Sequence, residues 1–179
     1  MKYCLTAAAA LLTAVAIPAR AQEVFAGLYA HCIDTPLTLY TGEEGLDMAL
    51  GYRFAPVEAL RAVGAPAPYV IGSLNSAGDT SFAGAGLSWT IGDGPFYLRP
   101  ALGVVVHEGP QRRVDALRGE RTDLGSRVLF EPEVGIGYRL SERVAVEASW
   151  MHISHARLFN RHQNPGVDMI GARVSLRLP

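Results

Sequence analysis

Residues 127–140 read RVLFEPEVGIGYRL, and this stretch decides the fold. Taken alternately, its positions separate into an apolar set and a set that mixes charges with glycine. The apolar set is Val128, Phe130, Val134, Ile136, Tyr138 and Leu140, and the opposing set is Leu129, Glu131, Glu133, Gly135, Gly137 and Arg139. Because successive side chains of a β-strand point to opposite faces, the stretch predicts a strand with one apolar and one polar face.

Similar alternation recurs along the chain. It fills eight segments bounded by turn residues, at 23–32, 46–54, 67–75, 81–91, 96–107, 127–140, 143–155 and 168–178. Several segments are long enough for a tilted strand to cross a membrane, and eight is the smallest usual strand number of a closed outer-membrane barrel. The sequence therefore predicts an all-β fold, an eight-stranded antiparallel up-and-down transmembrane β-barrel.

The connections also follow the pattern of an outer-membrane barrel. Those at 92–95 and 141–142 are tight turns, whereas those at 108–126 and 156–167 are long and polar. Short turns at one end and long loops at the other are expected of such a barrel. Two connections depart from the pattern, because 55–66 is long for a periplasmic turn and 76–80 is short for an outer loop.

Alternation alone leaves open which face lies inside, since a soluble lipocalin-like barrel uses the same period inverted. Residue size favours the membrane barrel, because the polar face carries small residues such as Gly84, Gly86 and Gly135, which suit a narrow interior. Its charges are then expected to form an interior ion-pair network, not a catalytic cluster. They are Glu131, Glu133, Glu147, Arg99, Arg139, Arg173 and Arg177.

Residues 1–21 have the pattern of a secretory signal peptide, with Lys2, an apolar run and Ala19-Arg20-Ala21 as a cleavage site. We expect residues 22–179 to form one domain. This part has 14 basic residues, all arginine, against 17 acidic ones, a formal net charge of −3 that argues against a nucleic-acid partner. Cys32 is its only cysteine, so we expect no internal disulfide, and the histidines show no metal spacing, so we expect no metal or cofactor.

The last predicted hairpin carries three residues whose types and spacing suit nucleophilic catalysis. His152 and Ser154 lie two residues apart on an alternating strand, and Asp168 opens the next strand with the parity of its apolar positions. His152 and Ser154 are then roughly 6.6 Å apart along the strand. If His152 pairs with Asp168, a base, a nucleophile and an orienting carboxylate meet on the apolar surface. A non-catalytic alternative is that His152 and Ser154 mark where the strand leaves the hydrocarbon beside an interfacial Trp150.

The hairpin resembles a known family. His152-Ile153-Ser154 is followed by Asn164-Pro165-Gly166 and an acid two positions later. In these residues the chain resembles the lipid A 3-O-deacylase (PagL-type) family of acyloxyacyl hydrolase-like outer-membrane barrels. The resemblance implies a serine esterase that removes an ester-linked acyl chain from lipid A, or lipopolysaccharide, in the outer leaflet of a Gram-negative outer membrane. Its catalytic residues would be Ser154 as nucleophile, His152 as base and then acid, and Asp168 where the family often has glutamate.

This chain departs from the family after the nucleophile. The family typically has Asn-Ala-Gly there and uses the first and third of these residues in an oxyanion hole, whereas this chain has His155-Ala156-Arg157. His155 and Arg157 become the oxyanion-hole candidates, and Trp150, Arg161 and Ile170 the substrate-binding candidates. The sequence leaves a homodimer open. It also leaves open two other functions, a non-catalytic structural or binding barrel of the same fold and a periplasmic lipid-carrying barrel.

Overall fold

The computed structural model describes residues 22–35, 41–109, 114–115, 120–121, 123–158 and 165–179. The predicted signal peptide, at residues 1–21, lies outside the described residues. Among the described residues, no helix has both the length and the apolar character needed to cross a bilayer.

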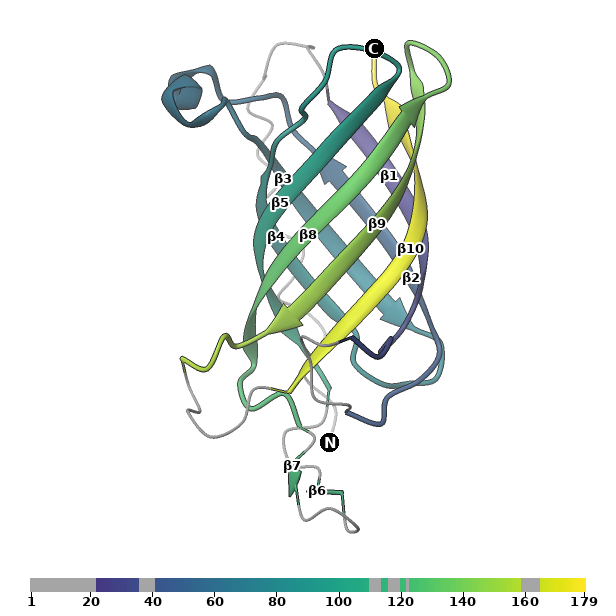
Figure 1. The fold of residues 1–179 in the computed structure, drawn as a ribbon, viewed down its shortest axis with the longest axis vertical. Helices are drawn as coiled ribbons and strands as arrows, with labels where there is room; N and C mark the ends of the chain where they lie inside the picture. Colours follow the sequence, from purple (N-terminus) through teal and green to yellow (C-terminus); the bar gives the residue numbers. More distant parts are fainter. Residues whose placement is uncertain (1–21, 36–40, 110–113, 116–119, 122, 159–164) are drawn as a thin grey trace, which may run out of the picture.

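Eight antiparallel strands close into a barrel in the order β1-β10-β9-β8-β5-β4-β3-β2 (Figure 1). Every neighbouring pair is antiparallel, and the predicted fold class is confirmed. The barrel strands are β1 (Glu23–Ala30), β2 (Leu46–Arg53), β3 (Ala67–Asn75), β4 (Phe82–Ser88), β5 (Phe96–His107), β8 (Val128–Arg139), β9 (Val144–Ser154) and β10 (Gly166–Arg177).

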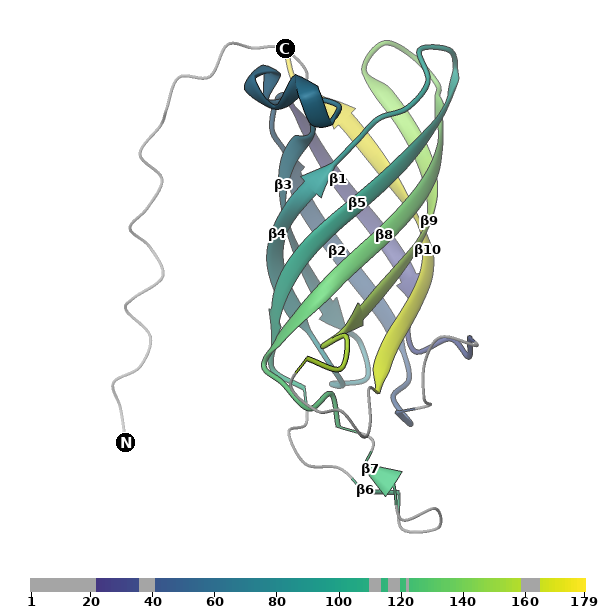
Figure 2. The same ribbon diagram turned by 60° about the vertical axis from the view of Figure 1, so that its left-hand side comes forward.

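Three short elements lie outside the barrel wall. The long connection after β5 contains the two-residue strands β6 (Val114–Asp115) and β7 (Glu120–Arg121), which the alternation did not predict. The connection between β2 and β3 forms the 3-10 helix η1 (Glu58–Val63), which projects beside the barrel end in Figures 1 and 2. This helix accounts for the unusual length of that turn.

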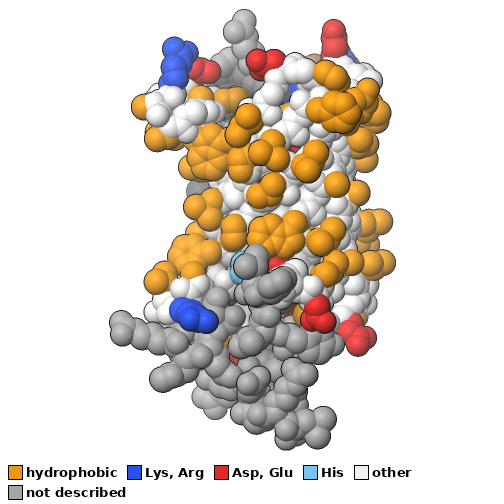
Figure 3. All heavy atoms as spheres, viewed as in Figure 1, with side chains coloured by type: hydrophobic (Ala, Val, Ile, Leu, Met, Phe, Trp, Pro, Cys, Tyr) orange, Lys and Arg blue, Asp and Glu red, His pale blue; other side chains and the backbone are white. Residues whose placement is uncertain are grey.

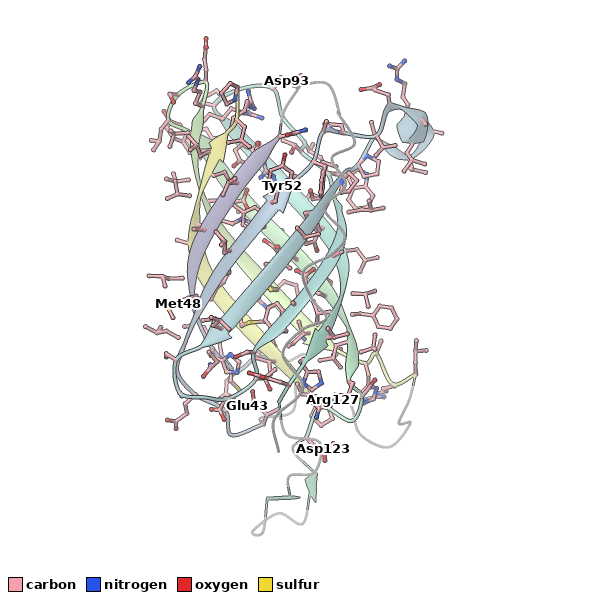
Figure 4. All side chains as sticks on the ribbon, turned by 180° about the vertical axis from the view of Figure 1, so that it is seen from behind. Glu43, Met48, Tyr52, Asp93, Asp123 and Arg127 are labelled. Carbon is pink, nitrogen blue, oxygen red and sulfur yellow. The ribbon has the colours of Figure 1, made fainter. Side chains whose placement is uncertain are left out.

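The two ends of the barrel differ (Figures 1 and 2). β1 begins and β10 ends at the same end as the turns at 92–95 and 140–143, whereas the connections after β1, β5 and β9 lie at the other end. In Figure 4, Asp93 lies at the first end, and Glu43, Asp123 and Arg127 lie at the second. In an outer-membrane barrel the end with short turns faces the periplasm and the end with long loops faces outward.

The apolar face of each strand points outward. Ile136 is 64% exposed, whereas Glu131 and Glu133, on the opposite face of the same strand, are at most 2% exposed. Figure 4 shows Met48 pointing away from the barrel, and Figure 3 shows the apolar side chains gathered in a band between charged ends. A soluble barrel would turn this face inward, so the lipocalin-like alternative is wrong, as is the lipid-carrying barrel that depended on it.

The interior holds the expected ion-pair network. Arg173 pairs with Glu133 at 2.7 Å and also with Glu147, and Arg99 pairs with Glu147 at 3.4 Å. Gly135 leaves room for these charges, because a Cβ atom there would lie 2.6 Å from a carboxylate oxygen of Glu147. Desolvated charges of opposite sign thus neutralise one another inside the wall.

The membership of the network differs from the prediction in part. Glu23 and Arg53 belong to it, with an ion pair at 2.6 Å, although neither was predicted. Glu131 accepts a hydrogen bond from Tyr69, not from an arginine. Arg139 donates to the carbonyls of Gly92 and Gly94 in a turn. Arg177 is exposed at the barrel end and pairs with no carboxylate among the described residues.

Candidate active site

Three polar side chains of β9 and β10 form a chain of hydrogen bonds. The Nε2 atom of His152 lies 2.8 Å from Ser154 Oγ, and its Nδ1 atom lies 3.0 Å from Asp168 Oδ1. When Nδ1 carries the proton, the imidazole donates to the carboxylate and accepts the serine hydroxyl at Nε2. The serine can then lose its proton to a base whose orientation an acid fixes.

The register of the last hairpin brings these groups together. His152 lies directly opposite Asp168, and Ser154 lies opposite Gly166. A step of two residues along β9 keeps His152 and Ser154 on the same face, and the cross-strand pairing adds the carboxylate beside them. The contact between His152 and Asp168 that the sequence predicts requires this register.

The site lies where β9 ends and β10 begins, at the barrel end with the long connections (Figure 1). The alternate residues Met151 and Ile153 are buried inside at 1% and 0% exposure, so His152 and Ser154 belong to the outward face. Phe130 of β8 lies opposite Ser154 on one side, and Gly166 of β10 lies opposite it on the other. Because glycine has no side chain, the residue of β10 directly opposite Ser154 places no side chain beside the serine hydroxyl.

The carboxylate of Asp168 is fully buried although its strand faces outward. Its Oδ1 atom also accepts a hydrogen bond from Trp150 Nε1 at 2.9 Å, and its Oδ2 atom accepts one from the Thr35 hydroxyl. The Ile33 N–H donates to the Asp168 backbone carbonyl at 2.9 Å. Side-chain donors therefore fix both carboxylate oxygens, and the segment after β1 covers them.

Thr35 and Ile33 were missed by the sequence reasoning. They follow β1, at the opposite end of the chain from Asp168, and no motif connects them with it. Only closure of the barrel makes them neighbours, because β1 pairs with β10 and places Ala30 opposite Ile170. The signal that could have found them is this closure, applied to the polar residues that follow the first strand.

The three predicted substrate-binding residues differ in their positions and contacts. Trp150 stacks near His152, with ring centroids 6.0 Å apart, and uses its N–H on Asp168, so it supports the acid directly. Ile170 lies opposite Trp150 and is 47% exposed on the outer wall, where an acyl chain could contact it. Arg161 lies outside the described residues.

The residues after Ser154 form a tight turn. The Leu158 N–H donates to the His155 carbonyl at 3.0 Å, and the two central residues, Ala156 and Arg157, have φ angles of 52° and 60°. Positive φ at both central positions is the pattern of a type I′ turn, which favours Gly and Asn. Arg157 thus adopts a backbone conformation suited to the glycine of the resembled family, and its side chain is exposed.

The His155 imidazole is fully buried and packs against Gly125, whose added Cβ atom would lie 3.0 Å from His155 Nε2. Gly125 has a φ angle of 70° and its N–H donates to Asp123. The imidazole of this oxyanion-hole candidate therefore lies against the segment that leads into β8.

A second buried polar cluster lies at the same end, just beyond β1. His31 contacts Asp47 at 2.7 Å and Glu43 at 2.9 Å, and Glu43 accepts from the Thr80 hydroxyl at 2.9 Å. Burial opposes the charge of His31, but the hydrogen bonds to the two carboxylates outweigh it and raise the pKa of His31 to about 9. The cluster anchors the chain immediately before Ile33 and Thr35.

Comparisons with known proteins identify a family by a sequence model and the barrel fold by solved structures. The family model described as lipid A 3-O-deacylase (PagL) matches residues 45–177. The crystal structure of the outer membrane enzyme PagL matches with a TM-score of 0.61 and 16% identity, covering 87% of this chain and 99% of that one. The crystal structure of Neisserial surface protein A matches with a TM-score of 0.56 and 12% identity, covering 88% and 97%. The search of curated proteins found no match.

Proposed function

The chain belongs to the lipid A 3-O-deacylase (PagL) family, and from this membership we propose that it hydrolyses an ester-linked acyl chain of lipid A with Ser154, His152 and Asp168. It is a β-barrel of the Gram-negative outer membrane. The proposal assigns Ser154 as nucleophile, His152 as general base and then acid, and Asp168 as the group that orients His152.

The hydrogen-bond chain from Ser154 through His152 to Asp168 is the observation that carries the proposal. Polar side chains on a lipid-facing wall cost free energy, so their presence there needs a compensating role. A triad on the outer wall suits a substrate that arrives laterally within the membrane. Lipid A would present its acyl ester at this level without leaving the bilayer.

The proposed reaction proceeds in two steps. Ser154 Oγ attacks the ester carbonyl carbon while His152 Nε2 takes the hydroxyl proton. His152 then gives this proton to the departing sugar oxygen, which leaves as an alcohol, and the acyl group stays on Ser154. Water, deprotonated by His152, attacks the acyl-enzyme and releases the fatty acid, and Ser154 recovers its proton.

The surrounding wall is suited to an acyl chain. Ile170 and Val174 are 47% and 52% exposed on β10, on the same face as the triad. Apolar side chains there would contact the acyl chain while the ester carbonyl rests beside Ser154. Arg157, which is exposed in the turn after the nucleophile, and Arg161 would meet the phosphates of the glycolipid.

The turn after Ser154 favours a second candidate, a non-catalytic barrel that keeps the family's hairpin. His155 replaces the amide of the family pattern and lies against Gly125, so an oxyanion would depend on backbone N–H groups of the turn. The described residues and the related structures give no support to a homodimer, and neither candidate function requires one.

Mass spectrometry of lipid A separates the two candidates. Cells producing the wild-type chain are expected to lose one 3-hydroxyacyl mass from their lipid A, and cells producing Ser154→Ala are expected to keep it. Ser126→Ala, at the same end of the barrel but outside the triad, is the matched control and should behave as wild type. Unchanged lipid A with a folded, membrane-inserted wild-type barrel would reject the enzymatic function and leave the non-catalytic barrel.

A further inference from the structure

The interior of the barrel opens, at the end opposite to Ser154, into a cavity of about 160 Å³. Its lining includes five of the 14 arginines that follow residue 21, namely Arg53, Arg99, Arg139, Arg143 and Arg177. A wider hollow of about 520 Å³ shares Arg139, Arg143 and Arg177 with the cavity and also includes Asp93, which Figure 4 places at the barrel end. This end faces the periplasm, so a solute there could reach the cavity.

The positive charge of the cavity is only partly balanced. Its lining includes two carboxylates, those of Glu23 and Glu142. Glu23 is already engaged by Arg53 at 2.6 Å and by Arg99 at 3.1 Å. In the described part of the chain, no carboxylate forms an ion pair with the remaining three arginines of the lining.

Other features of the lining suit an anion. Arg139 is held in place by the carbonyl of Gly92 at 3.0 Å and lies over the Tyr97 ring at 4.6 Å, so its guanidinium is preorganised. Ser175 is 2% exposed, and its hydroxyl has no hydrogen-bond partner among the described residues. A buried hydroxyl without a partner is costly, and an oxyanion in the cavity would accept a hydrogen bond from it.

We propose that this cavity, which we call the arginine mouth, binds a small phosphate-bearing solute from the periplasm. Guanidinium groups match phosphate oxygens in pairs, and a phosphate has enough acceptor oxygens for several of them together with the Ser175 hydroxyl. The rim arginines, Arg143 and Arg177, are exposed and would meet the solute first. The site is separate from the triad and does not depend on the esterase function.

Calorimetric titration of the folded protein in uncharged detergent with inorganic phosphate tests the proposal. The wild type is expected to show saturable binding that weakens as sodium chloride is added. Loss of both rim guanidiniums in Arg143→Ala/Arg177→Ala is expected to weaken binding by roughly tenfold or more. Arg61→Ala, an exposed arginine of η1 outside the cavity, is the matched control and should bind as wild type.

Two further arms define the ligand and the independence of the site. Glycerol 3-phosphate in place of inorganic phosphate shows whether a phosphate ester, as in a lipid headgroup, or free phosphate is preferred, and stronger binding of either supports the site. Ser154→Ala should bind phosphate as wild type, whatever the outcome of the lipid A experiment. The migration of the double variant on gels without prior heating shows whether it is folded. The proposal is overturned if the wild type shows no saturable binding, or if the folded double variant binds phosphate as tightly as wild type.

Discussion

Asp168 lies directly opposite His152 in the pairing of β9 and β10, and its Oδ1 atom is 3.0 Å from His152 Nδ1. The resembled family often has glutamate at this position, which is one methylene longer. The short side chain suffices here because direct cross-strand partners have Cβ atoms only about 5 Å apart. The register therefore makes aspartate the side chain that fits, and glutamate one that would have to fold back.

We predict that Asp168→Glu lowers turnover of lipid A roughly tenfold, because the added methylene overpacks a site that is fully buried. Asp168→Asn is expected to cost more, about 10³- to 10⁴-fold, since an amide can stabilise the wrong imidazole tautomer. Initial rates on purified lipopolysaccharide in detergent provide the measurement. If Asp168→Asn were as active as wild type, Asp168 would not be the orienting acid.

Thr35 supplies the next prediction, because its hydroxyl donates to the Oδ2 atom of Asp168. Thr35→Val keeps the shape but removes the donor, and we expect kcat to fall roughly tenfold, the equivalent of one hydrogen bond, with little change in KM. Thr35→Ser retains the hydroxyl and serves as the matched control, with activity close to wild type. Equal losses in both variants would point to packing of the segment, not to the hydrogen bond.

The sequence predicts the barrel wall well because alternation separates the two faces of each strand and residue size indicates which face lies inside. Ile136 and Glu133 take opposite faces for the same reason that they alternate in the chain, and lipid outside and charge inside complete the assignment. Contact of His152 with Ser154 is also local, since the two residues lie two positions apart on one strand. Contact with Asp168 needed only the register of one hairpin.

Contacts that depend on closure or on loop conformation could not be predicted in this way. Thr35 and Asp168 are 133 positions apart and meet only because the first and last strands pair. His31 contacts Glu43, which lies in a connection that has no periodic pattern. Left-handed φ angles at Ala156 and Arg157 likewise contradict the preferences of those residue types, so composition gave no signal for this turn.

Arg157→Gly tests the strained turn after the nucleophile. Arg157 has a φ angle of 60°, a conformation that costs a residue with a side chain about 1 kcal/mol and costs glycine little. We expect the variant to unfold no more easily than wild type and to keep its kcat, because the turn next to Ser154 keeps its shape with less strain, whereas its KM for lipid A should rise with loss of the guanidinium. Urea unfolding and deacylation rates measure the two effects.

Arg157→Ala is the matched control for this variant, because it removes the guanidinium but keeps the strain. If both variants lose activity through a higher KM, the guanidinium itself binds the glycolipid. If only Arg157→Gly loses activity, the turn requires a rigid residue, which would contradict the role that we assign to strain.

His31 makes the stability of the outer end depend on pH. Hydrogen bonds to Asp47 and Glu43 raise its pKa to about 9, against about 6.5 when the chain is unfolded. A group whose pKa is raised in the folded state stabilises it fully below the unfolded pKa, and this contribution is lost as the pH rises through the folded pKa. The loss should begin above about pH 6.5, reach on the order of 3 kcal/mol, and be complete above about pH 9.

Urea unfolding in detergent between pH 6 and 10 measures this dependence. His31→Gln keeps a hydrogen-bonding side chain without the titration, so its stability is expected to be lower at pH 6 and to change less up to pH 10. Because His31 anchors the segment that carries Thr35, deacylation should also decline over the same range in the wild type. Parallel pH curves for the two proteins would show that His31 does not carry the titration.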